Sequence, residues 1–291
     1  MSALRGRVVV ITGAGRGLGR EHALLAADEG ARVVVNDLGA DVAGRGGDPT
    51  VAQAVVEEIT NAGGEAVASS ADVTTLDGAR ELLELALREF GAVHGLVNNA
   101  GILRDRMFVN MSEDDWDAVI RGHLRATFAP TRIFAAHWRN ESKAGRQPNA
   151  AVVNVSSTSG LIGAVGQTNY GAAKAGVAAL TAILAQELIR YGVRVNAITP
   201  VARTRMTQDL PGIGDMMAPP SDPAGFDVYH PGNVSPLVAW LLTADCPANG
   251  AVFYAKGGEI RQFVGWSYGW AVDRGTRWTV SEIDKELRGR V

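Results

Sequence analysis

Short runs of β-branched residues alternate along most of this chain with longer segments rich in Ala and Leu. The runs are, in chain order, RVVVITG, ARVVVND, AVASSAD, GLVNNAG, AAVVNVSS, VRVNAITP and AVFYAKGG. Helical periodicity occupies the intervening residues 17–29, 49–62, 75–90, 113–138, 168–190 and 233–243. Continuous apolar runs are typical of strands buried on both faces, and the long spacing between them requires crossover helices. The pattern therefore predicts a parallel sheet covered by helices.

This alternation predicts an α/β fold, a doubly wound (Rossmann-type) parallel sheet of about seven strands with helices on both faces. A chain of 291 residues, 46% of them hydrophobic, can bury the core of such a domain. We find no repeat, no low-complexity segment and no linker before residue 262. Residues 1–262 are therefore expected to form a single domain.

Three segments elaborate the predicted scaffold. Residues 38–50 form a Gly- and Asp-rich loop after the second strand, and residues 202–232 form a long loop that contains Met206, Met216 and Met217. Long loops at strand ends usually serve binding, so we expect loop 202–232 to contact the substrate. The extension 263–291 is expected to pack on the domain or on a partner subunit because it is aromatic. Its aromatic residues are Trp266, Tyr268, Trp270 and Trp278.

Charge and composition exclude several classes of protein. The net charge is −3 without a long run of Lys or Arg, which argues against nucleic acid or an anionic membrane as partner. The one cysteine, Cys246, forms no internal disulfide, and no apolar run approaches the roughly 20 residues of a bilayer span. The N-terminus enters a strand without the pattern of a signal peptide. We expect a soluble cytoplasmic protein, and the 4 lysines among 28 basic residues indicate a G+C-rich bacterial genome.

A glycine-rich turn follows the first predicted strand. The segment TGAGRGLGREHALLA carries Gly13, Gly15, Gly17 and Gly19. Glycines between a strand and a helix let the backbone approach a pyrophosphate, and the helix N-terminus supplies free N–H groups and partial positive charge. Such a turn can also merely close a loop. Its place before a helix, with Asp37 at the next strand end, favours a dinucleotide site.

Acidic residues at strand ends bear on the choice of cofactor. Asp37 can accept hydrogen bonds from the adenosine ribose and repel a 2′-phosphate, which favours NAD over NADP. Arg16 argues the other way, since a basic residue in the turn could meet that phosphate. We give Asp37 more weight because it occupies the place that the phosphate would need. Asp72, after the third strand, either contacts the adenine amino group or caps the next helix, and both readings stay open.

Three side chains suited to proton transfer occur in the segment SSTSGLIGAVGQTNYGAAKAG. Ser157 lies at a strand end, Tyr170 follows 13 residues later, and Lys174 lies one helical turn beyond Tyr170 on the same face. An ammonium can lower the pKa of a phenol from about 10 and can pass on a proton, whereas a guanidinium does not readily deprotonate. An exposed Tyr–Lys pair is the structural alternative. Ser157 and the glycine turn weigh against it.

Together these motifs resemble the short-chain dehydrogenase/reductase family over residues 6–262. They are Thr12-Gly13-x3-Gly17-x-Gly19, Asn98-Asn99-Ala100-Gly101, Ser157 and Tyr170-x3-Lys174. The resemblance implies that Tyr170 is the general acid/base, that Ser157 orients the substrate oxygen, and that Lys174 holds the nicotinamide ribose and lowers the Tyr170 pKa. It also implies a homodimer or homotetramer through the fourth and fifth helices.

The full set of site residues that we expect combines these motifs with neighbouring strand ends. Expected catalytic residues are Ser157, Tyr170, Lys174 and His123. Expected NAD-binding residues are Gly13, Gly15, Arg16, Gly17, Leu18, Gly19, Asp37, Asp72, Val73, Asn99, Ala100, Gly101, Tyr170, Lys174, Pro200 and Thr204. No metal site is expected. Hydride transfer requires only that both reactants be positioned and one proton be moved.

Two positions depart from the family pattern. His123 stands where the family has an asparagine whose backbone carbonyl holds a water that extends the proton relay from the lysine, and Val201 replaces a glycine after Pro200. The histidine could signal lost activity or identify a branch. Alternatively, it packs in the core, because Trp116, Ile120, His123 and Thr127 share a helix face. We favour a relay role, through the backbone and with the imidazole assisting.

Several segments resemble one branch of the family, the (3R)-hydroxyacyl-CoA dehydrogenase part of multifunctional enzyme type 2, also called a 17β-hydroxysteroid dehydrogenase, which carries histidine at this place. They are VVVNDLGAD, NNAGILRDRMF, IRGHLRATF, GQTNYGAAKAG, Thr204–Thr207 and the insertion after Asp37. We expect an NAD-dependent enzyme that interconverts a secondary alcohol and a ketone on a 3-hydroxyacyl-CoA or hydroxysteroid. Its methionine-rich loop could repack around an apolar body. The alternatives are an NADPH-dependent 3-oxoacyl thioester reductase and a non-catalytic NAD-binding sensor or scaffold.

Overall fold

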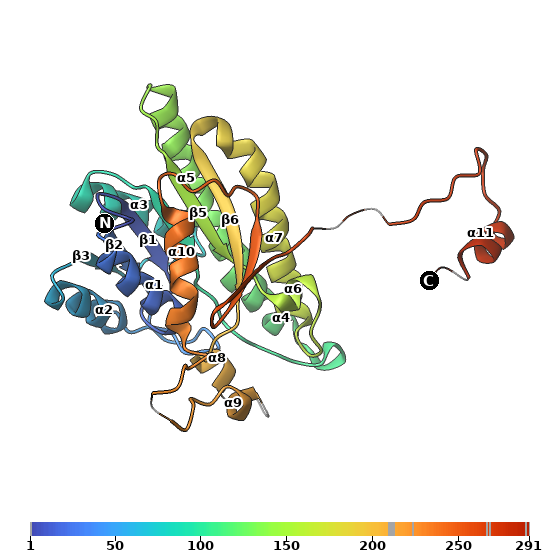
Figure 1. Ribbon diagram of the computed structural model, residues 1–291, viewed down its shortest axis with the longest axis horizontal. Coiled ribbons are helices and arrows are strands. Elements are labelled where there is room, and N and C mark those ends of the chain that lie inside the picture. Colours follow the sequence, from blue (N-terminus) through green and yellow to red (C-terminus); the bar gives the residue numbers. More distant parts are fainter. Residues whose placement is uncertain are drawn as a thin grey trace.

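One eight-stranded sheet organises the protein. The computed structural model describes residues 2–208, 213–222, 224–265, 267, 269–288 and 290. The strands lie in the order β3-β2-β1-β4-β5-β6-β7-β8, all parallel except β8, which pairs antiparallel with β7 (Figure 1). The predicted doubly wound fold is therefore confirmed. The edge strand β8 was not anticipated, because Gly257 and Gly258 close a short hairpin just after the last predicted run.

Helices and strands alternate with the bounds that follow. The strands are β1 Val8–Thr12, β2 Arg32–Asn36, β3 Glu65–Ser69, β4 Gly95–Asn98, β5 Ala150–Val155, β6 Val193–Pro200, β7 Val252–Lys256 and β8 Glu259–Gln262. The helices are α1 Gly17–Asp28, α2 Thr50–Asn61, α3 Leu76–Phe90, α4 Glu113–Ile120, α5 Ala126–Lys143, α6 Thr158–Leu161, α7 Thr168–Leu188, α8 Arg205–Gln208, α9 Ile213–Met216, α10 Ser235–Leu242 and α11 Val280–Leu287.

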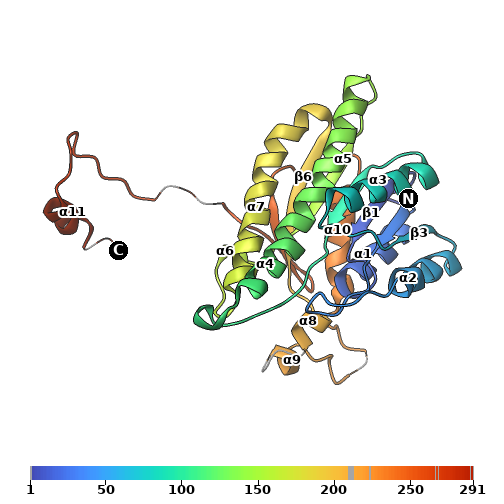
Figure 2. The same ribbon diagram turned by 180° about the vertical axis from the view of Figure 1, so that it is seen from behind.

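Two apolar layers hold the helices to the sheet. Helices α1, α2 and α10 cover one face, whereas α3, α5 and α7 cover the other (Figures 1 and 2). In the second layer Phe134 and Trp138 are buried and meet edge to face at 5.8 Å between ring centroids. The Trp138 indole donates to the Val93 carbonyl at 2.9 Å, so no polar atom of this large side chain is left unsatisfied.

A buried chain of amide and hydroxyl groups fixes the central strands against two helices. Asn98 of β4 donates to Asn154 of β5 at 2.8 Å and to Thr131 of α5 at 2.9 Å. Asn154 in turn donates to Thr181 of α7 at 2.9 Å. Because a buried polar group costs stability unless it is paired, this network specifies one register between the sheet and the helices next to the site.

The predicted helix 113–138 is in fact broken into three parts. Helix α4 is followed by a π-helical turn, η2, over Arg121–Arg125, and then by α5, which runs on to Lys143. The Ala126 N–H reaches the carbonyls of both Arg121 and His123. A π-turn changes the direction of the side chains that follow it and occurs frequently at functional sites. His123 lies at the centre of this turn.

Among the described residues, α7 with its continuation to Tyr191 is long and apolar enough to cross a membrane by length and composition alone. No such segment is expected from the sequence. In the structure this helix packs in the domain, where Thr181 bonds to Asn154 and Lys174 is buried. Those contacts are the ones expected of a core helix.

The C-terminal extension leaves the sheet after β8. Figures 1 and 2 both show α11 well separated from the rest of the chain. Helix α11 begins with a capping box between Thr279 and Glu282, and the Trp270 side chain is exposed. Trp266 and Tyr268 lie outside the described residues. Docking of the extension on a partner subunit stays a prediction.

Candidate active site

A cavity of about 460 Å³ opens at the carboxyl ends of the central strands, where the strand order reverses between β1 and β4. Ligands of open α/β sheets bind in this crevice. Predicted site residues that line it are Gly13, Arg16, Gly17, Leu18, Asp37, Val73, Asn99, Ala100, Gly101, His123, Ser157, Tyr170, Lys174, Pro200 and Thr204. Of the predicted residues, Gly15, Gly19 and Asp72 do not line it.

The glycine turn is shaped for close approach. Gly13 has φ +62°, and a Cβ there would lie 2.7 Å from the Ala100 Cα. A Cβ on Gly19 would lie 2.2 Å from the Gly13 carbonyl oxygen, so Gly19 serves the packing of α1 rather than a ligand. The nearest atom to a Cβ on Gly17 would belong to Thr204, 3.5 Å away across the cavity. The turn thus leaves backbone open to the cavity, as a pyrophosphate requires.

Asparagine side chains tie this turn to the end of β4. Asn99 donates to the carbonyls of Thr12 and Gly13 at 3.0 and 2.9 Å. The Thr12 hydroxyl accepts from the N–H groups of Asn99 and Ala100 at 3.0 and 3.1 Å. Both sides of the crevice are therefore held at a fixed separation, which fits the stabilising turn that the family resemblance implies.

Asp37 is fixed by the backbone at the cavity wall. Its Oδ2 accepts from the Gly15 N–H at 2.9 Å, and its Oδ1 accepts from the Gly39 N–H at 2.7 Å. Gly15, although outside the cavity lining, is thus needed to hold this carboxylate. A Cβ on Gly15 would stand 2.4 Å from Val51 and 2.9 Å from the Asp37 carboxylate.

The structure adds Arg205, which sequence reasoning missed, to this end of the cavity. Burial and Arg16 lower the pKa of Arg205, while Asp37 and Asp41 raise it. Two cations and two carboxylates therefore lie close together where the adenosine ribose is expected. In the sequence, Arg205 belongs to Thr204–Thr207, a segment that marks the branch, and only Thr204 of that segment is predicted to bind the cofactor.

Asp72 does not cap helix α3. The N-cap is Thr75, whose hydroxyl accepts from the Gly78 N–H at 3.0 Å. Asp72 accepts from the Thr74 N–H at 2.9 Å and lies 3.5 Å from the Arg121 guanidinium. Of its two open readings, the helix cap is wrong, and the adenine contact stays a prediction.

Ser157, Tyr170 and Lys174 meet at the other end of the cavity. Ser157 caps α6, its Oγ accepting from the Ser159 N–H at 3.2 Å. Tyr170 lies in the first turn of α7, and Lys174 Nζ lies 5.6 Å from its ring centroid. The Lys174 ammonium donates to the Val155 carbonyl at 2.6 Å. The local spacing seen in the sequence therefore does bring the three side chains together.

The electrostatics of this group differ from the expectation. Burial raises the pKa of Tyr170 to about 12, while a hydrogen bond with Ser157 lowers it and the Asp105 charge raises it. Burial also lowers the pKa of Lys174 to about 7. Near neutral pH the lysine thus carries a partial charge, and in the protein alone burial outweighs it, so the phenol pKa lies above its ordinary value. In the protein alone Tyr170 is a proton donor.

His123 is clamped between the loop after β4 and the catalytic ring. Its Nε2 lies 2.7 Å from the Ile102 carbonyl oxygen and 3.2 Å from the Ile102 nitrogen. Its ring meets that of Tyr170 edge to face at 5.0 Å, and a Cβ on Gly101 would lie 2.1 Å from His123 Cε1. Burial and then Lys174 hold the pKa of His123 well below its usual value, so the imidazole is neutral.

The unused nitrogen of His123 bears on its role. If Nε2–H donates to the Ile102 carbonyl, the shorter contact, Nδ1 is an acceptor, and it is buried without a partner. The His123 carbonyl already accepts from the Ala126 N–H. The imidazole therefore packs against Ile102 and Tyr170, and its relay role stays a prediction.

A chain of hydrogen bonds that was not predicted from the sequence runs from the cavity wall to Asp105, near Tyr170. Ser159 Oγ donates to Gln167 Oε1 at 2.7 Å, and Gln167 Nε2 donates to Asp105 Oδ2 at 2.7 Å. Burial raises the pKa of Asp105. Asp105 and Gln167 belong to the segments NNAGILRDRMF and GQTNYG, and in the sequence they serve only to identify the branch. Within the described part of the chain, no group of three or more His, Cys, Asp or Glu side chains could hold a metal ion.

A crevice with a glycine turn at one end and a Ser–Tyr–Lys group at the other is typical of a dinucleotide-dependent oxidoreductase. A family model described as short chain dehydrogenase matches residues 7–212. The chain belongs to this short-chain dehydrogenase family, and it is an oxidoreductase that acts on CH–OH groups. Members bind a nicotinamide cofactor, and the residues that line the crevice fit one.

Named relatives lie in the predicted branch. Hydroxyacyl-CoA dehydrogenase ChsB1 of Mycobacterium tuberculosis is 42% identical over 301 residues, covering 98% of this chain and 88% of the relative. Peroxisomal multifunctional enzyme type 2 of Mus musculus is 42% identical over 255 residues, covering 88% of this chain but only 32% of the relative. A crystal structure of a short chain dehydrogenase from Mycobacterium avium superposes with a TM-score of 0.87 at 49% identity, covering 99% and 95% of the two chains.

Replacing the buried lysine should stabilise the protein without cofactor. The folded pKa of Lys174, about 7, lies below its ordinary 10.5, so the unfolded chain binds an extra proton between these values and wild-type stability rises with pH across that window. Lys174→Met should raise the free energy of unfolding by about 1–3 kcal/mol near pH 6, reduced by the stability that the lost hydrogen bond to Val155 supplied. The increase should be smaller toward pH 10. Urea unfolding across pH measures this, with exposed Lys143→Met as control. A difference independent of pH would contradict it.

Substituting the clamped histidine should slow the reaction more than it weakens cofactor binding. In His123→Asn the shorter side chain loses the imidazole contacts to Ile102 and Tyr170. A loss of about 1.4 kcal/mol corresponds to about a tenfold fall in kcat. Steady-state kinetics and NADH titration measure the two effects, and His137→Asn on the following helix is the control. Full activity of His123→Asn would show that the backbone alone suffices.

Proposed function

We propose that this protein is an NAD-dependent dehydrogenase that oxidises the secondary hydroxyl of a 3-hydroxyacyl-CoA or hydroxysteroid and catalyses the reverse reduction. The observation that carries the proposal is the convergence of Ser157, Tyr170 and Lys174 in one crevice whose far end holds Asp37. The name of the mycobacterial relative, hydroxyacyl-CoA dehydrogenase, supports the acyl-CoA class.

The chemistry required of this chain is the movement of one proton. The nicotinamide, when bound, supplies the site for hydride. Tyr170 Oη removes the hydroxyl proton in oxidation and returns it in reduction, and Ser157 orients the substrate oxygen. Lys174, with its lowered pKa of about 7, can accept and release the proton that passes through the phenol. His123 Nδ1 offers a further acceptor beside it.

The loop after β6 supports an apolar substrate. Arg203 donates to the Met217 carbonyl at 2.7 Å and forms an ion pair with Asp227, so the base of the loop is tied together. Met206 and Met217 line the cavity. A thioether side chain adapts to apolar groups of different shape, which suits an acyl chain or a ring system.

We further propose that the protein is a cytoplasmic homo-oligomer. A groove of about 430 Å³ lies between α5 and α7, lined by Phe128, Leu184 and Tyr191 among others. It supports the proposed homodimer or homotetramer, since Phe128 exposes 44% of its surface there. A cytoplasmic location follows from the sequence expectation alone.

The second candidate function is an NADPH-dependent 3-oxoacyl thioester reductase. Arg16 and Arg205 beside the ribose position favour it, because a 2′-phosphate could pair with both. Asp37 opposes it, since the carboxylate is fixed by two backbone N–H groups and cannot easily turn away.

Turnover tests the proposed reaction directly. The wild type should form NADH with 3-hydroxyacyl-CoA esters of graded length or with hydroxysteroids. Tyr170→Phe should lower kcat by at least about 100-fold because the acid/base group is lost. Its NADH dissociation constant should stay near the wild-type value, and Tyr254→Phe should behave as wild type. Comparable turnover by Tyr170→Phe would refute the assigned mechanism.

Exchange of the ribose-binding carboxylate should change the cofactor preference. We expect the wild type to bind NADH more tightly than NADPH. Asp37→Ser should shift the ratio of the two dissociation constants toward NADPH by about tenfold or more, because repulsion is removed and two arginines remain. Adding Arg205→Gln should reverse most of that shift. Fluorescence titration measures each constant, and tighter NADPH binding by the wild type would overturn the NAD assignment.

A further inference from the structure

The two walls of the cofactor crevice are joined on the outside by a pair of hydrogen bonds. One wall is formed by Asp37–Asp41 at the start of loop 38–50, and the other includes Ile102 and Leu103 after β4. Immediately beyond these residues, the Leu103 N–H donates to the Val42 carbonyl at 2.9 Å. Arg104 Nε donates to the Ala43 carbonyl at 3.1 Å. Only the second bond comes from a side chain.

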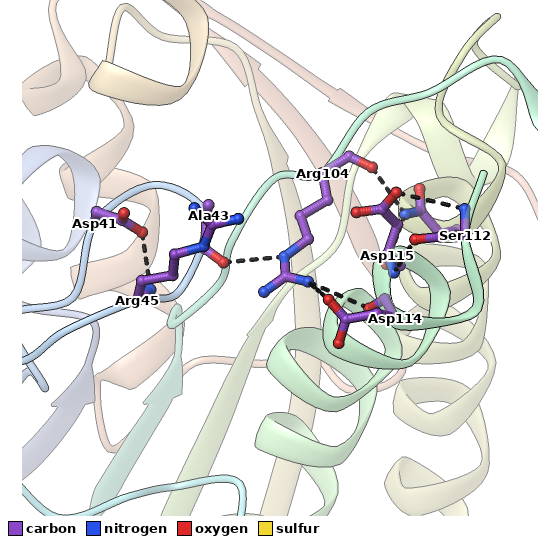
Figure 3. Close-up of polar contacts among 8 residues, drawn as sticks. Asp41, Ala43, Arg45, Arg104, Ser112, Asp114 and Asp115 are labelled. Carbon is purple, nitrogen blue, oxygen red and sulfur yellow. Dashed lines mark hydrogen bonds and ion pairs between the residues drawn. The ribbon is translucent and has the colours of Figure 1, made fainter. Parts of the chain in front are cut away.

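Arg104 reaches in two directions at once. Figure 3 shows its guanidinium between the Ala43 carbonyl and Asp114 at the start of α4. The Arg104 side chain is only 15% exposed, whereas that of Asp114 is 86% exposed. The ion pair is therefore open to water on one side and contributes little by itself.

A glycine in the loop makes this close contact possible. Gly44 has φ +81°, and a Cβ there would lie 3.1 Å from Ile102 Cγ2. Gly46, in the same loop, has φ +74° but would place its Cβ in open space. The loop therefore approaches the opposite wall closely at Gly44 and not at Gly46.

The backbone of Arg104 is tied to the catalytic helix. Its carbonyl accepts from Asn169 Nδ2 at 3.0 Å, and the same amide donates to the Asp115 carbonyl at 3.0 Å. Asn169 Oδ1 accepts from the Tyr170 N–H at 2.8 Å, and Asn169 is fully buried. Arg104 thus connects the loop that carries the cofactor wall to the residue beside the acid/base.

We propose that Arg104 is a positioning residue that sets the width of the crevice around the adenosine half of the dinucleotide, by holding loop 38–50 against the segment that supports Tyr170. This inference rests on the proposed dinucleotide site. Loop 38–50 then closes one side of that site. Arginine is required because its planar fork serves Ala43 and Asp114 together, and a lysine ammonium has no such fork.

The test measures the dissociation constant of ADP-ribose, which lacks the nicotinamide, for the wild type and its variants by isothermal titration calorimetry. Arg104→Lys keeps the charge and should keep Asp114 as partner while losing Ala43. Its dissociation constant for ADP-ribose should rise about 5- to 10-fold, with kcat at saturating cofactor within about twofold of wild type. The KM for the alcohol should not change. A purely structural defect would lower the fraction of competent protein without moving the dissociation constant.

Gly44→Ala disturbs the contact between loop 38–50 and Ile102 from the loop side. It should weaken ADP-ribose binding to a similar degree. Gly46→Ala introduces the same backbone strain without the contact to Ile102, and Arg45→Gln removes an exposed charge from the same loop. Both should bind as wild type does. Wild-type affinity in folded Arg104→Lys and Gly44→Ala would overturn the proposal, as would equal weakening by Gly46→Ala. Because ADP-ribose binding needs no turnover, this result is independent of the substrate assigned above.

Discussion

The site depends on two neighbouring asparagines at the end of β4. Asn98 faces the buried side, where it bonds to Asn154 and Thr131, and Asn99 faces the crevice, where it bonds to the carbonyls of Thr12 and Gly13. Pairing of the two amide N–H groups avoids the desolvation cost of buried donors, whereas Asn98 Oδ1 is buried without a partner. The backbone ladder sets the spacing of β1 and β4, and the two asparagine side chains fix the chain at the strand ends, where the crevice opens.

Residues whose roles follow from local spacing could be predicted from sequence. Tyr170 and Lys174 lie one turn apart on a helix, so their spacing in the sequence predicts that they are neighbours. Asp37 ends the strand beside the glycine turn, and its place at the cofactor site could be predicted in the same way. Arg205, Asp105 and Gln167 could not be placed, because their positions depend on how long loops fold back on the crevice. The π-turn at His123 was missed for a related reason, since a single added residue leaves hydrophobic periodicity almost unchanged.

Burial opposes the electrostatic effect that the family resemblance implies for Lys174 and Tyr170. A lysine beside a tyrosine suggests a lowered phenol pKa, but that inference holds only while the lysine remains charged. Here Lys174 is buried against a carbonyl, and its own pKa falls to about 7. The sequence shows that the two groups are near each other. Their exposure to water, which decides the sign of the effect, is a property of the packed domain.

Helix α7 joins two parts of the molecule that have been described separately. Its first turns carry Asn169, Tyr170 and Lys174, and its last turns, with Leu184 and Leu188, line the groove beside α5. At 21 residues the helix is a rod of about 30 Å. A partner bound in that groove would contact one end of the helix that carries the proton donor near its other end. A displacement of about 1 Å at the reacting atoms can cost about 100-fold in rate. Helix α7 would then link subunit contact in the groove to proton transfer at Tyr170.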